Sequence, residues 1–470
     1  MIYFSRIIIS LFILSALSIT TYAFPVSVDE NIEFISAACR LAGFDEYSDN
    51  MNKSYTERLD SIMHPYSEHP SINFLRDVRK NQGIGYDAIA ALAVHTDIDN
   101  GHLILKDGAD VTLADDRWRT GQDKDLLPLL DDLYQSCNFT DFYKSNAELY
   151  SHAVDNAQQL LSGCDLNWLN EFYGKELSGS RLVLSLLNRG NYGMTQSIVG
   201  KPDKSVIIIC CRDLDEYGYP IFTGQNSLIV HESSHPICNP LVLTNINQFN
   251  NNIELAAELM EDALYCQSYS GGTTMMCESM VRSVELQYAI AHNHDDNSCE
   301  NYMRDQMSNG FIFMPEIRAA LETYNKDRNT YPVIDSIMPL IISNVNNADV
   351  ASRYAQIKNG SPKILGCSIQ DGATNIEASD SLEIKFYFDQ PIRKGSFGMN
   401  FYNDNEDIMP ELADISPKIK LSEDGLILHV YIQTKPGKEY GFTMNGNFYR
   451  GLEGYRGHGN TNVHFFTKPS

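Results

Sequence analysis

The chain has 470 residues, of which 61 are acidic and 36 are basic, so its formal charge is −25. This length allows two or three domains. A surface this negative repels nucleic acids and anionic membranes, so we expect neither as a partner, and solubility outside the cell is the simplest reason for the charge.

The first 23 residues have the layout of a secretory signal peptide. Arg6 is the only charge in this segment, an apolar run covers residues 7–17, and a small-residue stretch ends at Ala23. The run is shorter than the roughly 20 apolar residues that a membrane helix needs. We expect cleavage after Ala23, which removes one positive charge and takes −25 to −26. The mature chain is then secreted or periplasmic, able to associate with the cell surface, and without a membrane span.

Helical periodicity dominates residues 28–170. Short apolar, partly β-branched segments then predict strands at residues 182–184 and 206–211, with a turn at 200–203 between them. Helical patterns return over residues 226–343. The clearest of these helices are expected at residues 253–266, 275–291 and 332–342.

The periodicity changes again near residue 359. Apolar and polar residues alternate over 382–388 and 426–432, and Ser422-Glu423-Asp424-Gly425 predicts a hairpin turn before the second run. About 110 residues of such strands are typical of a β-sandwich of immunoglobulin-like size. The tail also resembles bacterial Ig-like domains, through Pro362, Asp371-Gly372-Ala373-Thr374 and the strand end at 386–391. Domains of this kind usually act as spacers or binding modules, so we assign the tail no chemistry.

The ten cysteines are scattered through the chain, and none has the CxxC spacing of a cysteine-based zinc site. Cys210 and Cys211 end an apolar run, which favours buried thiols. Cys238, Cys266 and Cys277 lie in the region of the motif described next, and the sequence does not assign their pairing.

The segment His231-Glu232-Ser233-Ser234-His235 has the spacing of a zinc metallopeptidase motif. Histidines four residues apart on a helix place both imidazoles on one face, where they can reach one metal ion. The intervening Glu232 can then act as the general base toward a zinc-activated water, whose pKa the metal lowers. The apolar residues just before His231 favour a buried helix start.

Two features oppose a regular helix at this motif. Pro236 cannot donate to the Glu232 carbonyl, and it biases His235 away from helical angles. The adjacent serines, at 233 and 234, are also poor helix formers. A helix that ends at this point is expected, with Asn239 as its left-handed cap and Pro240 as its stop.

A catalytic zinc site needs a third protein ligand, and no third histidine follows at a short spacing. The candidates are carboxylates on the following helices: Glu254, Glu258, Glu261 and Glu278. By position alone, Glu254 and Glu258 fit the shorter loops of some glutamate zincins. The residues themselves leave these two even with Glu278.

A resemblance separates the candidates. The region 31–343 resembles a family of secreted bacterial proteins known only as a domain of unknown function, with a predicted glutamate-zincin-like metallopeptidase core. The matching motifs are Arg40-Leu41-Ala42-Gly43-Phe44, Asn191-Tyr192-Gly193, Val230-His231-Glu232 through His235 with Asn239-Pro240, Glu278-Ser279-Met280-Val281-Arg282-Ser283 and Gly310-Phe311. The resemblance implies that Glu278 lies on the third-ligand helix and completes a Zn²⁺ site with His231 and His235. Pro236 departs from the usual zincin pattern.

Other residues have weaker claims to a role at the site. Arg282 lies one turn after Glu278 and can orient its carboxylate, although an ordinary surface salt bridge is an equal alternative. Tyr192 and Tyr288 are candidate donors to the oxyanion of a tetrahedral intermediate. The histidine cluster at 292–295 is more typical of a solvated loop than of a metal site.

We therefore expect an α+β protein. Residues 24–358 form a mainly helical zincin-like domain with a small β-sheet, and residues 359–470 form an Ig-like β-sandwich. The expected function is hydrolysis of peptide or protein substrates, in which the strand at 206–211 forms part of the sheet beside which an extended peptide binds. The main alternative is an inactive zincin-like protein that binds a surface glycan or protein. A glycoside hydrolase is a third possibility, because acidic residues are abundant, although no carboxylate pair stands out.

Overall fold

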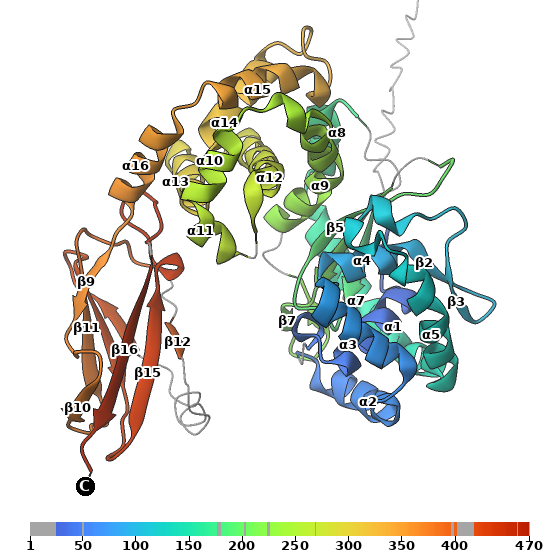
Figure 1. The fold of residues 1–470 in the computed structure, drawn as a ribbon, viewed down its shortest axis with the longest axis horizontal. Coiled ribbons are helices and arrows are strands. Elements are labelled where there is room, and N and C mark those ends of the chain that lie inside the picture. Colours follow the sequence, from blue (N-terminus) through green and yellow to red (C-terminus); the bar gives the residue numbers. More distant parts are fainter. Residues whose placement is uncertain are drawn as a thin grey trace, which may run out of the picture.

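The computed structural model describes residues 25–48, 51–175, 180–201, 204–222, 226–267, 269–395, 399–401, 418–457 and 459–469. The predicted signal peptide, residues 1–23, lies outside these residues. Within the described ranges, no helix is both long enough and apolar enough to cross a membrane. The fold is α+β, as expected, and is built on three hydrophobic cores: those of an N-terminal lobe, a helical lobe and a C-terminal β-sandwich (Figure 1).

The N-terminal lobe contains a four-stranded sheet of order β1-β4-β6-β5. Its strands are β1 (Val26–Ser27), β4 (Arg181–Ser185), β5 (Tyr192–Gln196) and β6 (Lys204–Cys210). β1, β4 and β6 are parallel, and β5 runs antiparallel to β6 at one edge. The strands predicted at 182–184 and 206–211 are confirmed as β4 and β6. β5 was not predicted, because Tyr-Gly-Met-Thr-Gln has little apolar alternation.

Seven helices surround this sheet, as the sequence periodicity predicts. They are α1 (Glu30–Ala42), α2 (Lys53–Met63), α3 (Pro70–Gln82), α4 (Asp87–His95), α5 (Gln122–Ser136), α6 (Phe139–Ser145) and α7 (Ala147–Ser162). The predicted helical region is interrupted by a hairpin of β2 (Thr96–Asp99) and β3 (His102–Leu105), which the sequence analysis missed. Its turn uses Asn100 and Gly101, both at positive φ. A second short hairpin joins β7 (Asp213–Leu214) to β8 (Pro220–Ile221).

The helical lobe follows and contributes the second core. Its helices are α8 (Leu166–Tyr173), α9 (Asn226–Asn245), α10 (Asn252–Leu259), α11 (Glu261–Tyr265), α12 (Gly271–Ala291), α13 (Asp296–Ser308), α14 (Met314–Lys326), α15 (Met338–Asn346) and α16 (Val350–Gly360). α9 packs against α12 along its length. Ile229 of α9 belongs to the core of the N-terminal lobe and Val230 to that of the helical lobe, so α9 joins the two.

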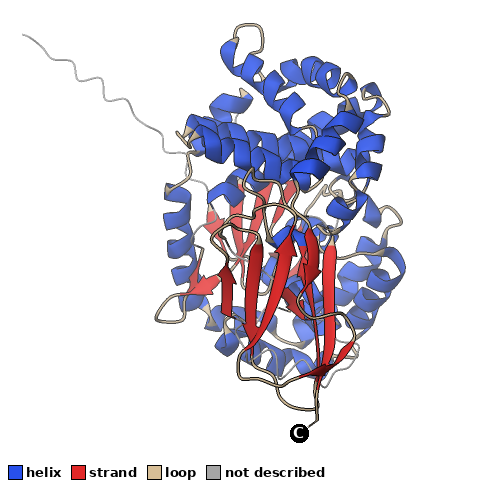
Figure 2. Cartoon of the chain, turned by 90° about the vertical axis from the view of Figure 1, so that its left-hand side faces the viewer, coloured by secondary structure: helices blue, strands red, loops and turns tan. Residues whose placement is uncertain are grey.

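The β-sandwich consists of two four-stranded sheets that face each other across the third core (Figure 2). One sheet has the order β13-β14-β11-β9, and the other β10-β16-β15-β12. The strands are β9 (Ile364–Cys367), β10 (Ala373–Ile376), β11 (Leu382–Phe388), β12 (Met399–Phe401), β13 (Lys418–Leu421), β14 (Ile427–Ile432), β15 (Glu439–Asn445) and β16 (Asn460–Thr467). The predicted alternating segments are β11 and β14, which pair antiparallel. The predicted turn joins β13 to β14, with Gly425 at φ 73°.

No disulfide bond joins any of the described cysteines. Cys210 and Cys211 are buried, as the apolar run before them predicts. Cys238 and Cys277 are also buried, on α9 and α12, whereas Cys266 is exposed.

Candidate metal centre

Two packed helices bring three potential metal ligands together. α9 supplies His231 and His235 from successive turns, and α12 supplies Glu278. One potential ligand atom from each residue lies within 4.8 Å of the other two. The cluster is largely withdrawn from solvent, with His231 8% and Glu278 6% exposed. The three residues that the sequence pointed to are therefore neighbours in space.

The other carboxylates considered from the sequence lie outside this cluster. Glu254, Glu258 and Glu261 are exposed. Glu254 Oε2 instead accepts a hydrogen bond of 3.3 Å from the backbone N–H of Gly272, at the beginning of α12. A carboxylate there favourably meets the N-terminal end of the helix dipole, so a structural role accounts for Glu254.

The spacing of the three ligands suits a tetrahedral metal site. Nε2 of His231 and Nε2 of His235 lie 3.1 Å apart. Glu278 places Oε1 3.6 Å from His235 Nε2 and Oε2 3.7 Å from His231 Nε2. Metal–ligand bonds of about 2.1 Å at tetrahedral angles separate neighbouring ligand atoms by about 3.4 Å. The observed separations bracket that value.

Hydrogen bonds at the Nδ1 atoms of His231 and His235 determine whether Nε2 of each ring can accept a metal ion. His231 Nδ1 lies 3.2 Å from Glu285 Oε2, and His235 Nδ1 lies 3.3 Å from Asn239 Oδ1. Both partners are acceptors, so a neutral ring that donates to its partner from Nδ1 turns the lone pair of Nε2 inward. Two lone pairs and a carboxylate then face one another without a donor between them. A cation is the natural complement of that arrangement.

Glu278 supports the same conclusion. Arg282 Nη2 lies 3.2 Å from Glu278 Oε2, and the guanidinium stacks over the Phe311 ring at 4.3 Å. Even so, Glu278 Oε2 has no hydrogen-bond partner in the described part of the chain. A buried carboxylate oxygen that accepts no hydrogen bond is costly. A metal ion beside both imidazoles would satisfy Oε2 together with the Arg282 ion pair.

Glu285 and Tyr302 form an outer layer that the sequence analysis missed. Tyr302 Oη donates to Glu285 Oε2 at 2.6 Å, and the same oxygen faces His231 Nδ1. Burial lowers the pKa of His231, but the hydrogen bond and charge of Glu285 outweigh this and raise it above its ordinary value. Glu285 lies two turns after Glu278 on the same helical face, and this spacing is a sequence signal that points to it. Tyr302 lies on another helix, so no sequence spacing connects it to the motif.

The predicted end of the motif helix is wrong. α9 continues through Pro236 and Pro240 to Asn245, so Asn239 is not a cap but a partner of His235. The missing N–H of Pro236 leaves the Glu232 carbonyl without its intrahelical donor. Burial of α9 between two cores overrides this local cost, as tertiary packing commonly overrides helix propensity. Small buried serines on both helices allow α9 and α12 to pack closely: Ser234, Ser279 and Ser283.

Strand β5 lies directly against the Glu232 turn of α9. A Cβ atom on Gly193 would lie 3.0 Å from Glu232 Oε2 and closer still to the Glu232 carbonyl oxygen. Glycine is therefore required here by close approach. The strand predicted at 206–211 is part of this sheet as β6, but it lies between β4 and β5 and is not an edge strand. The edge strand next to Glu232 is β5.

The structure brings neither proposed oxyanion donor to the cluster. Tyr192 adjoins Gly193, so its side chain points to the opposite face of the sheet. Tyr288 lies ten residues after Glu278 on α12, about 15 Å along the helix, and its hydroxyl accepts a 2.7 Å bond from the Asp165 N–H. His292 stacks on Tyr288 and is also remote from the cluster.

A different tyrosine lies at the site. Tyr269, just before α12, is half-buried and packs edge-on against Phe311, with ring centroids 6.0 Å apart. Burial first, and then the charge of Glu278, raise the pKa of Tyr269 above its ordinary value. Its hydroxyl therefore keeps its proton at neutral pH. With 26 tyrosines in the chain, no sequence signal distinguishes this one.

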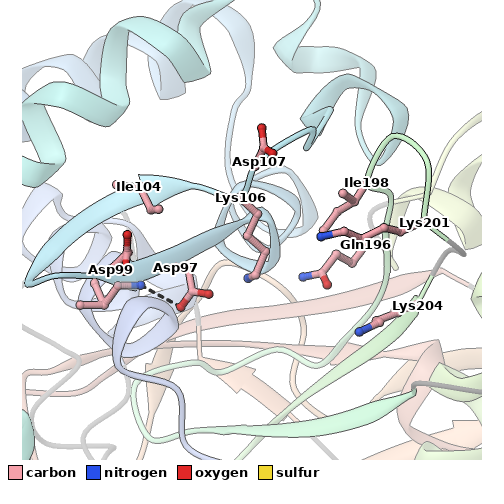
Figure 3. Close-up of a pocket in the computed structure, with 10 residues that line it drawn as sticks. Asp97, Asp99, Ile104, Lys106, Asp107, Gln196, Ile198, Lys201 and Lys204 are labelled. Atoms are coloured by element: carbon pink, nitrogen blue, oxygen red, sulfur yellow. Dashed lines mark hydrogen bonds between the residues drawn. The ribbon is translucent and has the colours of Figure 1, made fainter.

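The cavity shown in Figure 3 is a separate feature of the N-terminal lobe. It has a volume of about 400 Å³, and Lys106 lies between Asp97 on one side and Gln196, Lys201 and Lys204 on the other. Gln196 donates to Val94 O of α4, on the face of the sheet opposite to Gly193 and α9. Three aspartates balance its three lysines. The cavity thus has no charge preference, and none of the three clustered ligands lines it.

Comparison with known proteins yields one informative match. The sequence model of a family described as "Domain of unknown function (DUF4932)" matches residues 25–344. No curated protein matches the chain. A crystal structure of the S-layer protein rSbsC(31-844) is 12% identical over 53% of this chain, with a TM-score of 0.17 that carries no argument about fold. The chain spans 34% of the length of that structure.

Proposed function

The chain belongs to the DUF4932 family, and we propose that it is an exported zinc-dependent metallopeptidase. The observation that carries the proposal is the convergence of His231, His235 and the buried Glu278 carboxylate, with one potential ligand atom of each residue within 4.8 Å of the other two. His231, His235 and Glu278 would hold Zn²⁺. When bound, zinc supplies a Lewis acid that polarises a carbonyl and lowers the pKa of water to about 7.

The remaining chemistry is assigned to side chains of this chain. Glu232 places its Oε2 4.0 Å from His235 Nε2, at the edge of the cluster. It takes the proton of the attacking water and delivers it to the leaving amine. Tyr269, which keeps its proton, donates a hydrogen bond to the developing oxyanion. Glu285 and Asn239 hold the two imidazoles in the tautomer that binds metal.

The edge of β5 is the proposed substrate platform. An extended peptide can add to an exposed strand edge through backbone hydrogen bonds. Because Gly193 of β5 touches the Glu232 turn, a peptide bound along β5 passes beside the general base. In this proposal the N-terminal and helical lobes form a zincin-like pair, and the C-terminal β-sandwich is Ig-like.

Metal content tests the ligand assignment directly. Purified wild-type protein should hold about one zinc per chain after exposure to excess zinc and gel filtration. Glu278→Ala should lose it, whereas Glu254→Ala, which changes a carboxylate outside the cluster, should retain it. Full zinc occupancy of Glu278→Ala would exclude Glu278 as a ligand, and absence of zinc from the wild type would exclude the site.

A binding protein for a surface glycan or protein would take up zinc equally well but cleave no peptide. Pro236 favoured this alternative while the motif helix was expected to end early. The continuation of α9 to Asn245 removes that objection. Peptide cleavage that disappears with a chelator would exclude the alternative.

A further inference from the structure

The β-sandwich is joined to the helical lobe by charged contacts from one loop, residues 446–457. Arg450 Nε and Arg456 Nε each donate to Asp305 Oδ1 of α13 at 2.6 Å, and Arg456 Nη2 donates to Oδ2 at 2.9 Å. Asp305 is only 8% exposed. Burial raises the pKa of Asp305, but the two arginines outweigh it and hold the pKa below its ordinary value. The carboxylate therefore stays charged.

Further contacts place the same loop along α13. The backbone N–H of Arg456 donates to Ser308 Oγ at 3.2 Å, and Arg304 Nη1 donates to the Glu453 carbonyl at 3.2 Å. Gly454, at φ 98°, passes so close to α13 that a Cβ atom would lie 2.8 Å from Asn301 Oδ1. Its neighbour Tyr455 is 2% exposed and belongs to the core of the helical lobe.

α13 depends on such contacts because its own sequence is polar. Of its five buried residues, only Cys299 and Met307 are apolar, and the other three are Asp305, Gln306 and Ser308. A helix with so little apolar surface gains little from hydrophobic burial. Its position is therefore set largely by polar partners, and the loop of the β-sandwich supplies many of them.

The same face of α13 also reaches toward the candidate metal centre. Tyr302 lies one turn before Asp305 and donates to Glu285 Oε2 at 2.6 Å. Glu285 in turn faces His231 Nδ1 at 3.2 Å. Within one turn, α13 is thus bound to the β-sandwich through Asp305 and supports the first histidine of the cluster through Tyr302 and Glu285.

We propose that the β-sandwich is a built-in clamp on α13 that positions Tyr302 and, through Glu285, sets the affinity of the site for zinc. The proposal rests on the zinc site proposed above. It gives the C-terminal domain a role in the metal centre, in place of a spacer or an independent binding module. Asp305 and Tyr302 are positioning residues in this account, since neither touches the metal ligands directly.

A double-mutant cycle on zinc affinity tests the clamp in full-length protein. The variants are Asp305→Asn, Tyr302→Phe and their combination, and competition with a chromophoric chelator gives each zinc Kd. Arg353→Ala is the matched control, because it breaks a 2.7 Å ion pair with Glu316 in the same lobe that involves neither Asp305 nor Tyr302. Circular dichroism and thermal melting of the zinc-free proteins report separately on folding.

We expect Tyr302→Phe to weaken zinc binding about tenfold, as loss of an outer-layer partner typically does. Asp305→Asn should weaken zinc binding at least threefold. The double variant should weaken it no more than the stronger single variant does, because both substitutions act through Tyr302. Arg353→Ala should stay within twofold of wild type. If Asp305→Asn does not fold, Arg456→Lys, which keeps the charge but loses the paired donors, takes its place and should weaken binding at least twofold.

The clamp would be overturned if folded Asp305→Asn, or Arg456→Lys in its place, bound zinc as tightly as the wild type. The proposed zinc site would be unaffected by that result. Losses that multiply in the double variant would likewise overturn the clamp. Failure of the wild type to bind zinc would overturn both the clamp and the proposed function.

Discussion

Replacing Gly193 by alanine should separate strand β5 from helix α9 and displace Glu232. The added Cβ would lie 3.0 Å from Glu232 Oε2, whereas ordinary van der Waals contact begins at 3.4 Å, and it would lie closer still to the carbonyl oxygen. The carboxylate must therefore retreat by at least the difference, 3.4 − 3.0 = 0.4 Å, and the backbone by more. Neither partner yields easily, because both elements are packed into cores.

Two effects follow from this crowding. Overpacking at a rigid contact costs about 1–3 kcal/mol of unfolding free energy. Displacing a general base by about 1 Å can cost about a hundredfold in rate, so the smaller shift worked out here should cost at least about tenfold in kcat/KM. Zinc content should be unchanged, since Gly193 contacts none of the three ligands. Urea denaturation, zinc analysis and peptide cleavage measure the three quantities separately.

Gly366→Ala is the control for the Gly193 prediction. Gly366 also lies in a strand, β9, and a Cβ atom there would meet nothing within 4 Å. That variant should stay within about 0.5 kcal/mol of wild type in stability. If Gly193→Ala kept both wild-type stability and wild-type cleavage, β5 would not press on the Glu232 turn, and the assignment of β5 as the substrate platform would fail.

Two further predictions concern buried carboxylates. Glu285→Gln should weaken zinc binding about 10–100-fold, since it removes the charge that faces His231 Nδ1. The control is Glu383→Gln, which changes a similar carboxylate–histidine pair in the β-sandwich and should leave zinc affinity unchanged. Equal zinc affinities of the two variants would refute the role of Glu285. Burial raises the pKa of Glu33 to about 7, despite hydrogen bonds from the Leu186 N–H and Tyr55. The folded state thus favours protonated Glu33. The resulting contribution to the free energy of unfolding is present below pH 4.5 and is lost as the pH rises to about 7. It amounts to about 3 kcal/mol, so the decline in unfolding free energy between pH 5 and 8 should be smaller in Glu33→Gln; an unchanged decline would contradict the assignment.

The part of the site that could be predicted from sequence is the part encoded by short spacings. His231, Glu232 and His235 lie within two turns of one helix, so helical geometry alone places them together. The third ligand required a resemblance, because the residues themselves left Glu254, Glu258 and Glu278 even. One pair of strands in the tail was also predictable, since β11 and β14 of the same sheet show regular alternation of apolar residues.

Features that depend on tertiary packing could not be predicted. Pro236 and Pro240 predicted the end of a helix, and only burial between two cores explains why α9 continues. β5 has too little apolar pattern to be recognised, and its importance comes from lying beside Glu232. Tyr269 approaches the cluster from a loop and Tyr302 from another helix, so neither has a fixed spacing from the motif.

The most direct test of the central claim is peptide cleavage by zinc-loaded wild type and by Glu232→Gln. Both proteins should bind about one zinc, because Glu232 is not a ligand. A peptide library should be cleaved by the wild type and not by the wild type with chelator, and Glu232→Gln should lose at least about a hundredfold in rate, as expected for loss of a general base. Cleavage at the wild-type rate by zinc-loaded Glu232→Gln would contradict the assignment of the base. No cleavage by zinc-loaded wild type would contradict the peptidase itself.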